Sequence, residues 1–451
     1  MAGLLWLMAP PLLRGAVCRK TWPRPAEWAT RLRYNANFDT ATPPMALPPS
    51  APRLPAHLAP ARRAHRLIGT LAGLALTSLA TATTLTEGSG SSPAPRAERL
   101  AALLAPAALP GGCVARTRGA AVELQQAFGY ADVAQRRPYT VDTWQPVGSV
   151  SKTVIGLTLA QLAERGVVDL DAPIDRHLRT PLRHPAHPGV PITLRQLATH
   201  TSGIADSEAG YQQAAYERDR GDPQRPRQAL PDYLDAYLRP GGRLYQRSHF
   251  APAAPGARFQ YSNVGSALAA QVLANAAGQP FDVLSTTQVL QPLGLQHTGW
   301  FMPAHRAAER ATLYAGDRQP LAPYLLATYP DGGLRSTCAD LTRLLQAWAG
   351  ALDGQAPAPL TATALRAALA PQFAPGRTPP GLNAREPNQG LFFALRKDGS
   401  VGHTGSDDGV TVFLFLDPAT RVGRLFMTNI DISADPALPP RAAALWQALG
   451  N

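Results

Sequence analysis

The stretch PVGSVSKT, residues 146–153, places one of the chain's three lysines a helical turn after a serine. The chain has 43 Lys and Arg residues, yet only Lys20, Lys152 and Lys397 are lysines, so arginine supplies nearly all of its positive charge. Arginine keeps its proton, whereas a desolvated lysine can lose it and act as a base near neutral pH. The segment that follows, SKTVIGLTLAQLAERG (151–166), has apolar residues at helical spacing and a glycine at its end. We therefore expect Ser149 and Lys152 on one face at the start of a helix.

Ser149 and Lys152 have the chemistry of a nucleophile and its activating base. The N–H groups and partial positive charge of a helix N-terminus stabilise an oxyanion that develops at the serine, and a neighbouring neutral amine can accept the hydroxyl proton. The alternative is a helix cap followed by a surface charge, because one Ser-x-x-Lys pattern arises by chance with a probability of about 0.1. Two later stretches shift the balance towards catalysis.

The first stretch is FQYSN, residues 259–263, which contains Tyr261 and Asn263. A phenol placed against a lysine ammonium has a lowered pKa and can carry protons, and the two groups then titrate as a coupled pair. An amide two residues later can hold a substrate carbonyl. Taken alone, the pattern also fits a core tyrosine at a turn.

The second stretch is GHTGSDDG, residues 402–409, directly before a predicted strand hairpin. His403 and Thr404 offer polar side chains at a sheet edge, and Gly405 allows a close approach of the backbone. The backbone N–H of Ser406 is a candidate second oxyanion donor. Taken alone, this stretch also fits a plain polar turn.

Strand patterns stand at both ends of the foldable part of the chain, and helical patterns lie between them. Hairpins are predicted at 112–132, around a turn at Gly119, and at 410–430, before a closing helix at 439–450. We expect a mixed α/β fold, in which an antiparallel sheet flanked by helices is built from residues 97–150 and 340–451, with an all-helical domain, 151–339, inserted. Residues 194–200 and 266–278 are predicted helices of that insert. A Pro-, Gly- and Arg-rich insertion at about 205–256 precedes Tyr261 and is a candidate lid for a cleft.

The N-terminal part of the chain has the pattern of an export signal. Residues 62–82 contain a basic region, an apolar region and an Ala-x-Ala cleavage site, and are predicted to be a signal peptide. A leader (1–61) precedes them and a Gly/Ser/Pro-rich linker (83–96) follows. We expect a periplasmic or secreted protein whose translation starts at Met45, with an uncleaved membrane anchor as the alternative. After cleavage no stable membrane insertion is expected.

The charge pattern argues against a nucleic-acid partner. The formal net charge is +12, but ten of the basic residues and only two acidic ones fall in the first 82 positions, which leaves +4 for the rest. No basic run remains in that part, so we expect no nucleic-acid binding.

The three cysteines, Cys18, Cys113 and Cys338, form no pattern typical of a metal or redox site. We expect Cys113 and Cys338 to be two buried thiols, with a disulfide between them as the alternative in an oxidising compartment. Neither a metal nor a cofactor is expected.

In the order Ser-x-x-Lys, Tyr-x-Asn and His-Thr-Gly, the three stretches resemble the active-site signature of the serine β-lactamase and penicillin-binding protein superfamily. Tyr-x-Asn in second place is typical of its class C branch. The resemblance covers about residues 112–432 and includes ITLRQLATHTSGI (192–204), LQPLGLQHT (290–298) and DGGLRSTCADLTRLL (331–345).

The resemblance implies a role for each signature residue. It implies that Ser149 is the acylated nucleophile, Lys152 its activating partner and Tyr261 the general base. It also implies that Asn263 binds the substrate amide or ester side chain and that the N–H groups of Ser149 and Ser406 form the oxyanion hole. His403, Thr404 and Gly405 would line the edge strand of the site. His200, within the 192–204 stretch, is interpreted as structural.

The sequence departs from many members of this superfamily at the third triplet, where His403 replaces lysine. A histidine is mostly neutral at pH 7 and holds a substrate carboxylate less well, although Asp407 and Asp408 nearby can raise its pKa. We therefore favour a serine hydrolase of neutral esters or amides. A D-alanyl peptidase or D-aminopeptidase of the penicillin-binding type, a β-lactamase and a non-catalytic scaffold remain as alternatives. The expected partner is a small-molecule or peptide substrate.

Overall fold

A computed structural model describes residues 100, 103–104, 109–218 and 225–450 of the chain. The predicted leader, signal peptide and linker lie outside the described residues. Among the described residues, no helix is both long and apolar enough to cross a membrane.

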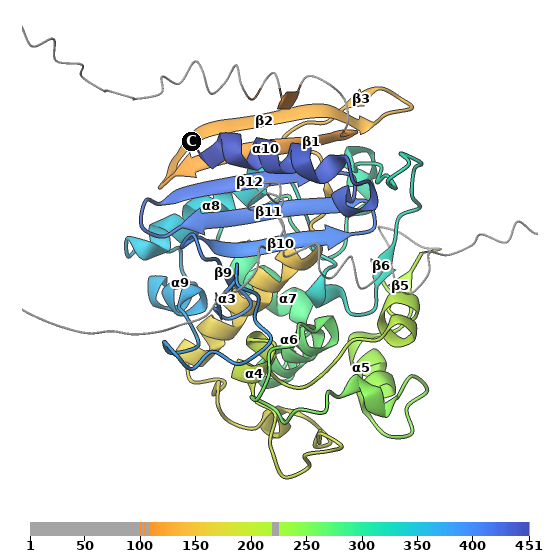
Figure 1. The fold of residues 1–451 in the computed structure, drawn as a ribbon, viewed down its shortest axis with the longest axis vertical. Helices are drawn as coiled ribbons and strands as arrows, with labels where there is room; N and C mark the ends of the chain where they lie inside the picture. Colours follow the sequence, from red (N-terminus) through yellow and green to blue (C-terminus); the bar gives the residue numbers. More distant parts are fainter. Residues whose placement is uncertain (1–99, 101–102, 105–108, 219–224, 451) are drawn as a thin grey trace, which may run out of the picture.

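The central element is one antiparallel sheet assembled from both ends of the described chain (Figure 1). The first long strand, β1, pairs with the last, β12, so that Gly112 faces Thr428 and Arg118 faces Val422. The eight strands lie in the order β3 (Arg137–Pro138), β2 (Ala121–Asp132), β1 (Gly111–Arg118), β12 (Val422–Thr428), β11 (Val410–Asp417), β10 (Val401–Asp407), β9 (Ala394–Leu395) and β8 (Asn388–Gln389). Both predicted hairpins are confirmed. The stretch predicted as a polar segment at a sheet edge, 402–409, is largely strand β10.

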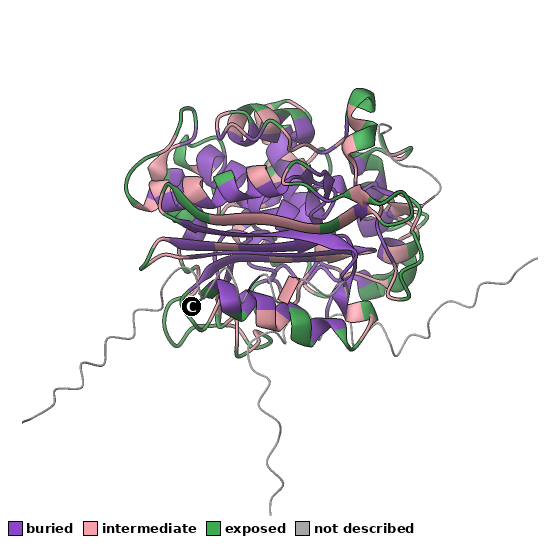
Figure 2. Ribbon diagram, turned by 90° about the horizontal axis from the view of Figure 1, so that it is seen from above, coloured by how far each residue is buried: buried purple, intermediate pink, exposed green. Residues whose placement is uncertain are grey.

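Helices cover both faces of the sheet, as Figure 2 shows. On β11, Val412 and Leu414 pack in the large core shared with helix α8 (Cys338–Leu352), whereas Phe413 and Phe415 pack against helix α10 (Leu438–Gly450). Successive side chains of a strand point to opposite faces. Because both faces are covered, this strand is apolar without a break from Val412 to Leu416 instead of alternating.

The second part of the fold is mainly helical and is built around α3 (Ser151–Glu164). Twelve of the fourteen residues of α3 are buried, and the helix packs against strand β10 as well as against other helices. Helices α6 (Asn263–Ala277), α7 (Phe281–Ser285) and α9 (Ala362–Leu369) contact α3, and α4 (Leu194–Ala198) and α5 (Leu230–Leu238) pack against α6. Two short strand pairs also occur, β4 (Gln145–Pro146) with β7 (Arg335–Ser336) and β5 (Tyr216–Glu217) with β6 (Leu325–Leu326).

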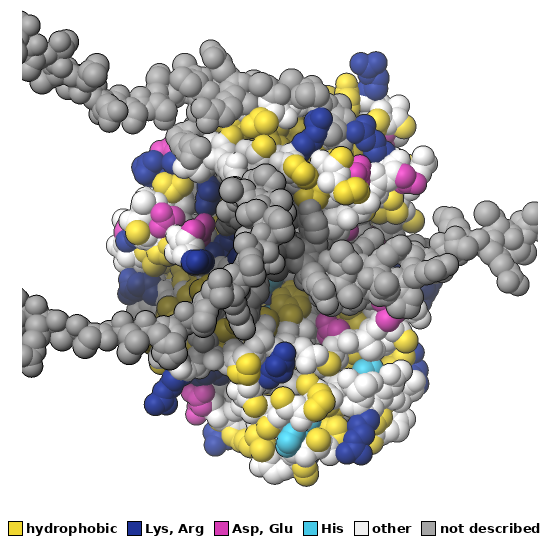
Figure 3. Space-filling model, in the orientation of Figure 1, with side chains coloured by type: hydrophobic (Ala, Val, Ile, Leu, Met, Phe, Trp, Pro, Cys, Tyr) yellow, Lys and Arg dark blue, Asp and Glu magenta, His cyan; other side chains and the backbone are white. Residues whose placement is uncertain are grey.

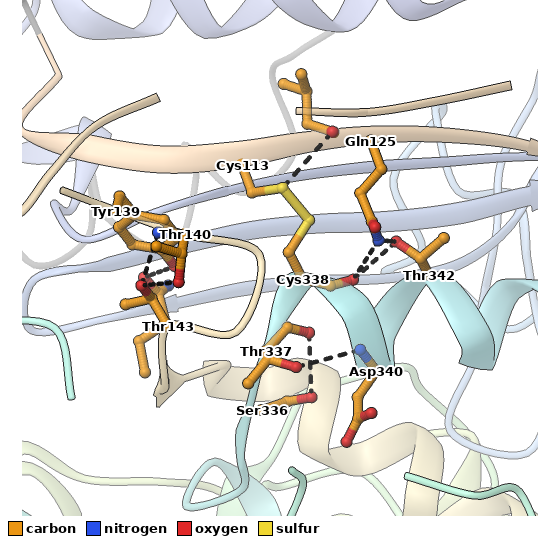
Figure 4. The surroundings of a disulfide bond; sticks show 12 residues. Cys113, Gln125, Tyr139, Thr140, Thr143, Ser336, Thr337, Cys338, Asp340 and Thr342 are labelled. Carbon is orange, nitrogen blue, oxygen red and sulfur yellow. Dashed lines mark hydrogen bonds between the residues drawn. A yellow bond between two sulfur atoms is a disulfide. The ribbon is translucent and has the colours of Figure 1, made fainter. Parts of the chain in front are cut away.

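Cys113 and Cys338 form a disulfide, so the expectation of two free thiols was wrong (Figure 4). Both residues are fully buried, as expected. The strand register places Cys113 on the face of β1 that α8 covers, and the first residue of α8 brings the two Cα atoms to 6.1 Å. Sequence spacing could not show this proximity, because 225 positions separate the two residues.

The described surface carries both signs of charge. On the face shown in Figure 3, the Lys and Arg side chains of the described residues are scattered among acidic and apolar ones instead of forming one basic patch.

Candidate active site

Ser149 lies in a single 3-10 turn, η1 (Gly148–Val150), that leads directly into α3. Gly148 has a φ of +53°, a conformation that glycine adopts at little cost. Strand β10 passes very close to this turn, because a Cβ atom on Gly405 would lie 2.0 Å from the carbonyl oxygen of Val147. A Cβ atom on Gly148 would lie 3.0 Å from the backbone nitrogen of Ser406. The two glycines therefore allow the Ser406 N–H to lie beside the serine turn.

The three predicted catalytic side chains meet at one oxygen atom. The Lys152 Nζ donates hydrogen bonds to the Oγ of Ser149 at 3.0 Å, to the Oδ1 of Asn263 at 2.7 Å and to the carbonyl oxygen of Asp331 at 2.6 Å. The hydroxyl of Tyr261 donates to the same Ser149 Oγ at 2.9 Å. Lys152 is completely buried, whereas Ser149 is partly exposed, so its hydroxyl can be reached from solvent.

The tyrosine hydroxyl is held in its protonated form. Burial raises the pKa of Tyr261, and this effect outweighs the opposing effect of the nearby Lys152 charge. The sequence had suggested the opposite direction, because burial of the phenol could not be judged from a single motif. As a phenol, Tyr261 can donate its proton to Ser149, as the geometry shows.

Asp206 and His200 lie outside the Tyr-x-Asn motif and hold the motif in place. The carboxylate of Asp206 accepts hydrogen bonds from the Ser262 hydroxyl at 2.9 Å and from the backbone N–H groups of Asn263 at 2.8 Å and Val264 at 3.1 Å, at the start of α6. The ring of His200 stacks on Tyr261 with centroids 4.4 Å apart, and its Nδ1 accepts from the Ser262 N–H. Burial holds the pKa of His200 well below 6.5, which agrees with a neutral, structural histidine.

His403 is a buried and neutral side chain in β10. It is 7% exposed, and its Nδ1 donates to the carbonyl oxygen of Thr404 at 2.5 Å. Burial, with the Lys152 charge as a second cause, lowers the pKa of His403 to about 4. The neighbouring acids do not raise it, because Asp407 accepts from the Tyr216 hydroxyl and Asp408 pairs with Arg218.

A buried acid near Lys152 was not found from the sequence. Asp331 ends the 3-10 turn η7 (Tyr329–Asp331), is fully buried, and accepts a hydrogen bond from the Tyr211 hydroxyl at 2.8 Å. Its only signal was its place in the DGGLRST landmark. Burial raises the pKa of Asp331 to about 7 despite the nearby lysine.

Tyr211 belongs to the 205–256 insertion that was predicted as a candidate lid. The described part of that insertion supplies Asp206 and Tyr211, which form part of the wall of the site. Among the described residues, no three His, Cys, Asp or Glu side chains are arranged to hold a metal ion.

In this site a buried amine and a phenol contact one serine hydroxyl at the start of a buried helix, beside the strand that carries a His-Thr-Gly triplet. This arrangement defines the β-lactamase class of proteins with an active-site serine. The sequence profile of the Beta-lactamase family matches residues 97–447, and the chain belongs to this family.

Parts of the chain are similar in sequence to curated proteins. The chain is 30% identical over 206 residues to "D-alanyl-D-alanine-carboxypeptidase/endopeptidase AmpH" of Escherichia coli, a match that covers 46% of this chain and 49% of that one. It is 26% identical to "Penicillin-binding protein 4*" of Bacillus subtilis, over 42% of this chain and 37% of that protein. The two matches thus cover about half the length of the first relative and less of the second.

Solved structures share the fold at lower sequence identity. The D-alanine carboxypeptidase AmpC from Burkholderia cenocepacia matches with a TM-score of 0.59 and 23% identity, over 80% of this chain and 99% of that one. A class C β-lactamase matches with a TM-score of 0.61 and 19% identity, over 79% and 96% of the two chains. The mixed α/β fold with an antiparallel sheet, predicted from the sequence, is therefore confirmed.

Proposed function

We propose that this protein is a serine hydrolase that forms a covalent acyl-enzyme at Ser149. The observation that carries the proposal is the meeting of Lys152 Nζ and the Tyr261 hydroxyl at the Ser149 Oγ, at 3.0 and 2.9 Å. Once the Ser149–Lys152–Tyr261 cluster has lost one proton to solvent, these two groups can accept the hydroxyl proton as Oγ attacks a carbonyl carbon, and return it to the leaving group as the carbon–oxygen or carbon–nitrogen bond breaks. Water then attacks the acyl-enzyme and releases the acid.

The developing oxyanion has donors on both sides of the serine. The N–H of Ser149 lies at the start of a helix, and the N–H of Ser406 lies on the strand that Gly405 brings against the turn. Preorganised donors of this kind stabilise a tetrahedral intermediate by several kcal/mol, on the order of 3 each. Asn263, held by Lys152 on one side, can bind the amide or ester group of the substrate.

We propose neutral esters or amides as the preferred substrates. A neutral imidazole stands at position 403, where a permanent cation would hold a substrate carboxylate, and burial keeps its pKa near 4. Penicillins and D-alanine-terminated peptides carry such a carboxylate, so their binding should be weaker.

The second candidate function is a D,D-carboxypeptidase or D-aminopeptidase of the penicillin-binding type. It is favoured by the similarity to a protein named as a D-alanyl-D-alanine carboxypeptidase/endopeptidase, at 30% identity over 206 residues. In that case deacylation after β-lactam attack would be slow, and a penicilloyl adduct would persist. The remaining alternative, a non-catalytic scaffold, requires that the buried Lys152 take no part in a reaction.

We also propose that the protein is exported. The disulfide between Cys113 and Cys338 supports this proposal, because such bonds persist in oxidising compartments and are rare where thiols are kept reduced. Protein fractionation followed by N-terminal sequencing tests it, and a mature start well before Ala82 would contradict cleavage of the predicted signal.

The test of the catalytic proposal uses two substrates and one variant. Purified protein and the Ser149→Ala variant are incubated with a short-chain p-nitrophenyl ester and, separately, with a fluorescent penicillin, and both turnover and intact mass are measured. Ester turnover that is lost in Ser149→Ala supports the hydrolase. A stable penicilloyl adduct without turnover supports the peptidase, and neither turnover nor adduct with any substrate supports the scaffold.

A further inference from the structure

A carboxyl group lies buried beside the catalytic amine, and the proposed reaction does not use it. Asp331 is the residue whose carbonyl oxygen accepts the 2.6 Å hydrogen bond from Lys152 Nζ. Its own side chain is fully buried and accepts from Tyr211 at 2.8 Å. The same residue therefore contacts the amine through its main chain and carries a buried ionisable group that interacts electrostatically with Lys152.

We propose that Asp331 is a positioning residue for acylation: its main-chain carbonyl fixes the direction of the Lys152 amine, and its buried carboxyl sets the pH at which the Ser149–Lys152–Tyr261 cluster loses its first proton. This proposal concerns the same site as the proposed function and rests on it for its catalytic meaning. Its charge effect, however, can be measured without any substrate.

The physical reason is independent of which group acts as the base. Before acylation the cluster goes from one positive charge to none, whether the proton leaves the amine or the phenol. A neighbouring carboxylate in a poorly hydrated region favours the positive form and opposes this step. A neutral carboxyl does not oppose it. The pKa of Tyr261 agrees with this reasoning. Burial is the main cause that raises it, and the charge of Asp331 acts in the same direction.

The carboxyl changes its charge in the range where the effect matters. Burial raises its pKa to about 7, while Lys152 and the Tyr211 hydrogen bond act in the opposite direction. Below that pH the group is neutral and the cluster gives up its proton more easily, and above it the negative charge retains the proton. The titratable or charged groups that interact with Asp331 are Lys152 on α3, Asp206 and Tyr211 of the insertion, Tyr216 on β5, Tyr233 on α5 and Tyr261 before α6, while Asp407 on β10 lies near the adjacent Gly332.

The test compares Asp331→Asn with two matched variants. Asparagine keeps the main-chain carbonyl and an oxygen for Tyr211 but removes the charge, so the first titration step of the cluster should move to lower pH by about one unit. Tyr211→Phe removes the hydrogen bond that lowers the pKa of Asp331, so the carboxyl stays neutral to higher pH and the step should move less, in the same direction. Asp340→Asn removes another buried carboxyl with a raised pKa, bound to Thr298 and the His297 N–H, and should leave the step unchanged.

The step is followed by NMR on protein labelled with ¹³C at the lysine Cε atoms. The chain has only three lysines, and Lys152→Arg assigns the signal of the buried one. The acid limb of kcat/KM for the p-nitrophenyl ester, measured on the same variants, should move with the NMR step. If neither wild type nor any variant hydrolyses the ester but the NMR titration step moves as predicted, the proposed function fails and the charge effect of Asp331 stands.

Three outcomes would overturn the proposal. The first is a titration step in Asp331→Asn that occurs at the same pH as in wild type. The second is a shift of the titration step in Asp340→Asn that equals the shift in Asp331→Asn. If Asp331→Asn does not fold, Tyr211→Phe decides, and an unmoved step in that variant refutes the role. A purely structural role would lower the kcat/KM plateau without moving its acid limb.

Discussion

The close contact between β10 and the serine turn gives a sharp prediction for Gly405→Ala. The new Cβ atom would stand 2.0 Å from the carbonyl oxygen of Val147, a distance that real Cβ atoms do not adopt. Strand and turn must separate by about 1 Å to relieve this contact, at a cost of about 1–3 kcal/mol in the free energy of unfolding. The same movement carries the Ser406 N–H away from the oxyanion. Because a misplacement of that size removes much of one donor's effect, acylation should slow by about 10² to 10³.

Gly112→Ala is the matched control, because its Cβ would stand 2.1 Å from the carbonyl oxygen of Met427 in the same sheet, on β1. Strands β12 and β11 separate β1 from β10. Chemical denaturation should show a similar loss of stability in both variants, whereas single-turnover acylation with the p-nitrophenyl ester should slow strongly only in Gly405→Ala. The reasoning is refuted if Gly405→Ala acylates like wild type, or if Gly112→Ala slows acylation as much.

Three further predictions concern the lysine, the disulfide and the histidine. Lys152→Arg should keep the fold by circular dichroism but slow acylation by about 10³ or more, because the guanidinium keeps its proton; wild-type acylation would refute the base role. The double variant Cys113→Ser/Cys338→Ser should lose up to about 5 kcal/mol of unfolding free energy in urea, from the chain entropy of a 225-residue separation, and an unchanged midpoint would contradict it. A histidine with a lowered folded-state pKa binds a proton more readily when unfolded, so lowering the pH from 6.5 to about 4 should remove about 3 kcal/mol through His403. In His403→Gln the stability curve should be flatter over that range, and an equally steep curve would speak against a buried neutral imidazole.

The sequence predicted the parts of this fold that depend on local patterns. The helix after Ser149, the two hairpins and the closing helix follow from apolar spacing and turn residues, which act over a few positions. The three signature stretches carried the resemblance that placed Lys152 and Tyr261 at one serine. The structure brings them together as expected.

Features that depend on distant contacts could not be predicted. Asp331 lies 179 positions from Lys152 and reaches it through a main-chain carbonyl, which has no sequence signature. Asp206 stabilises the Tyr-x-Asn turn from 57 positions away. The raised pKa of Tyr261 and the lowered pKa of His403 both result from burial, which only the packed structure defines.

The central claim is that Ser149 is the residue that becomes acylated. The direct measurement is a millisecond acid quench of the protein with excess p-nitrophenyl ester, followed by proteolysis and peptide mass spectrometry. The account predicts one acyl group, on the peptide that contains Ser149, present in wild type and missing in Ser149→Ala. An acyl group on another residue, or the same burst of p-nitrophenol in Ser149→Ala, would contradict it.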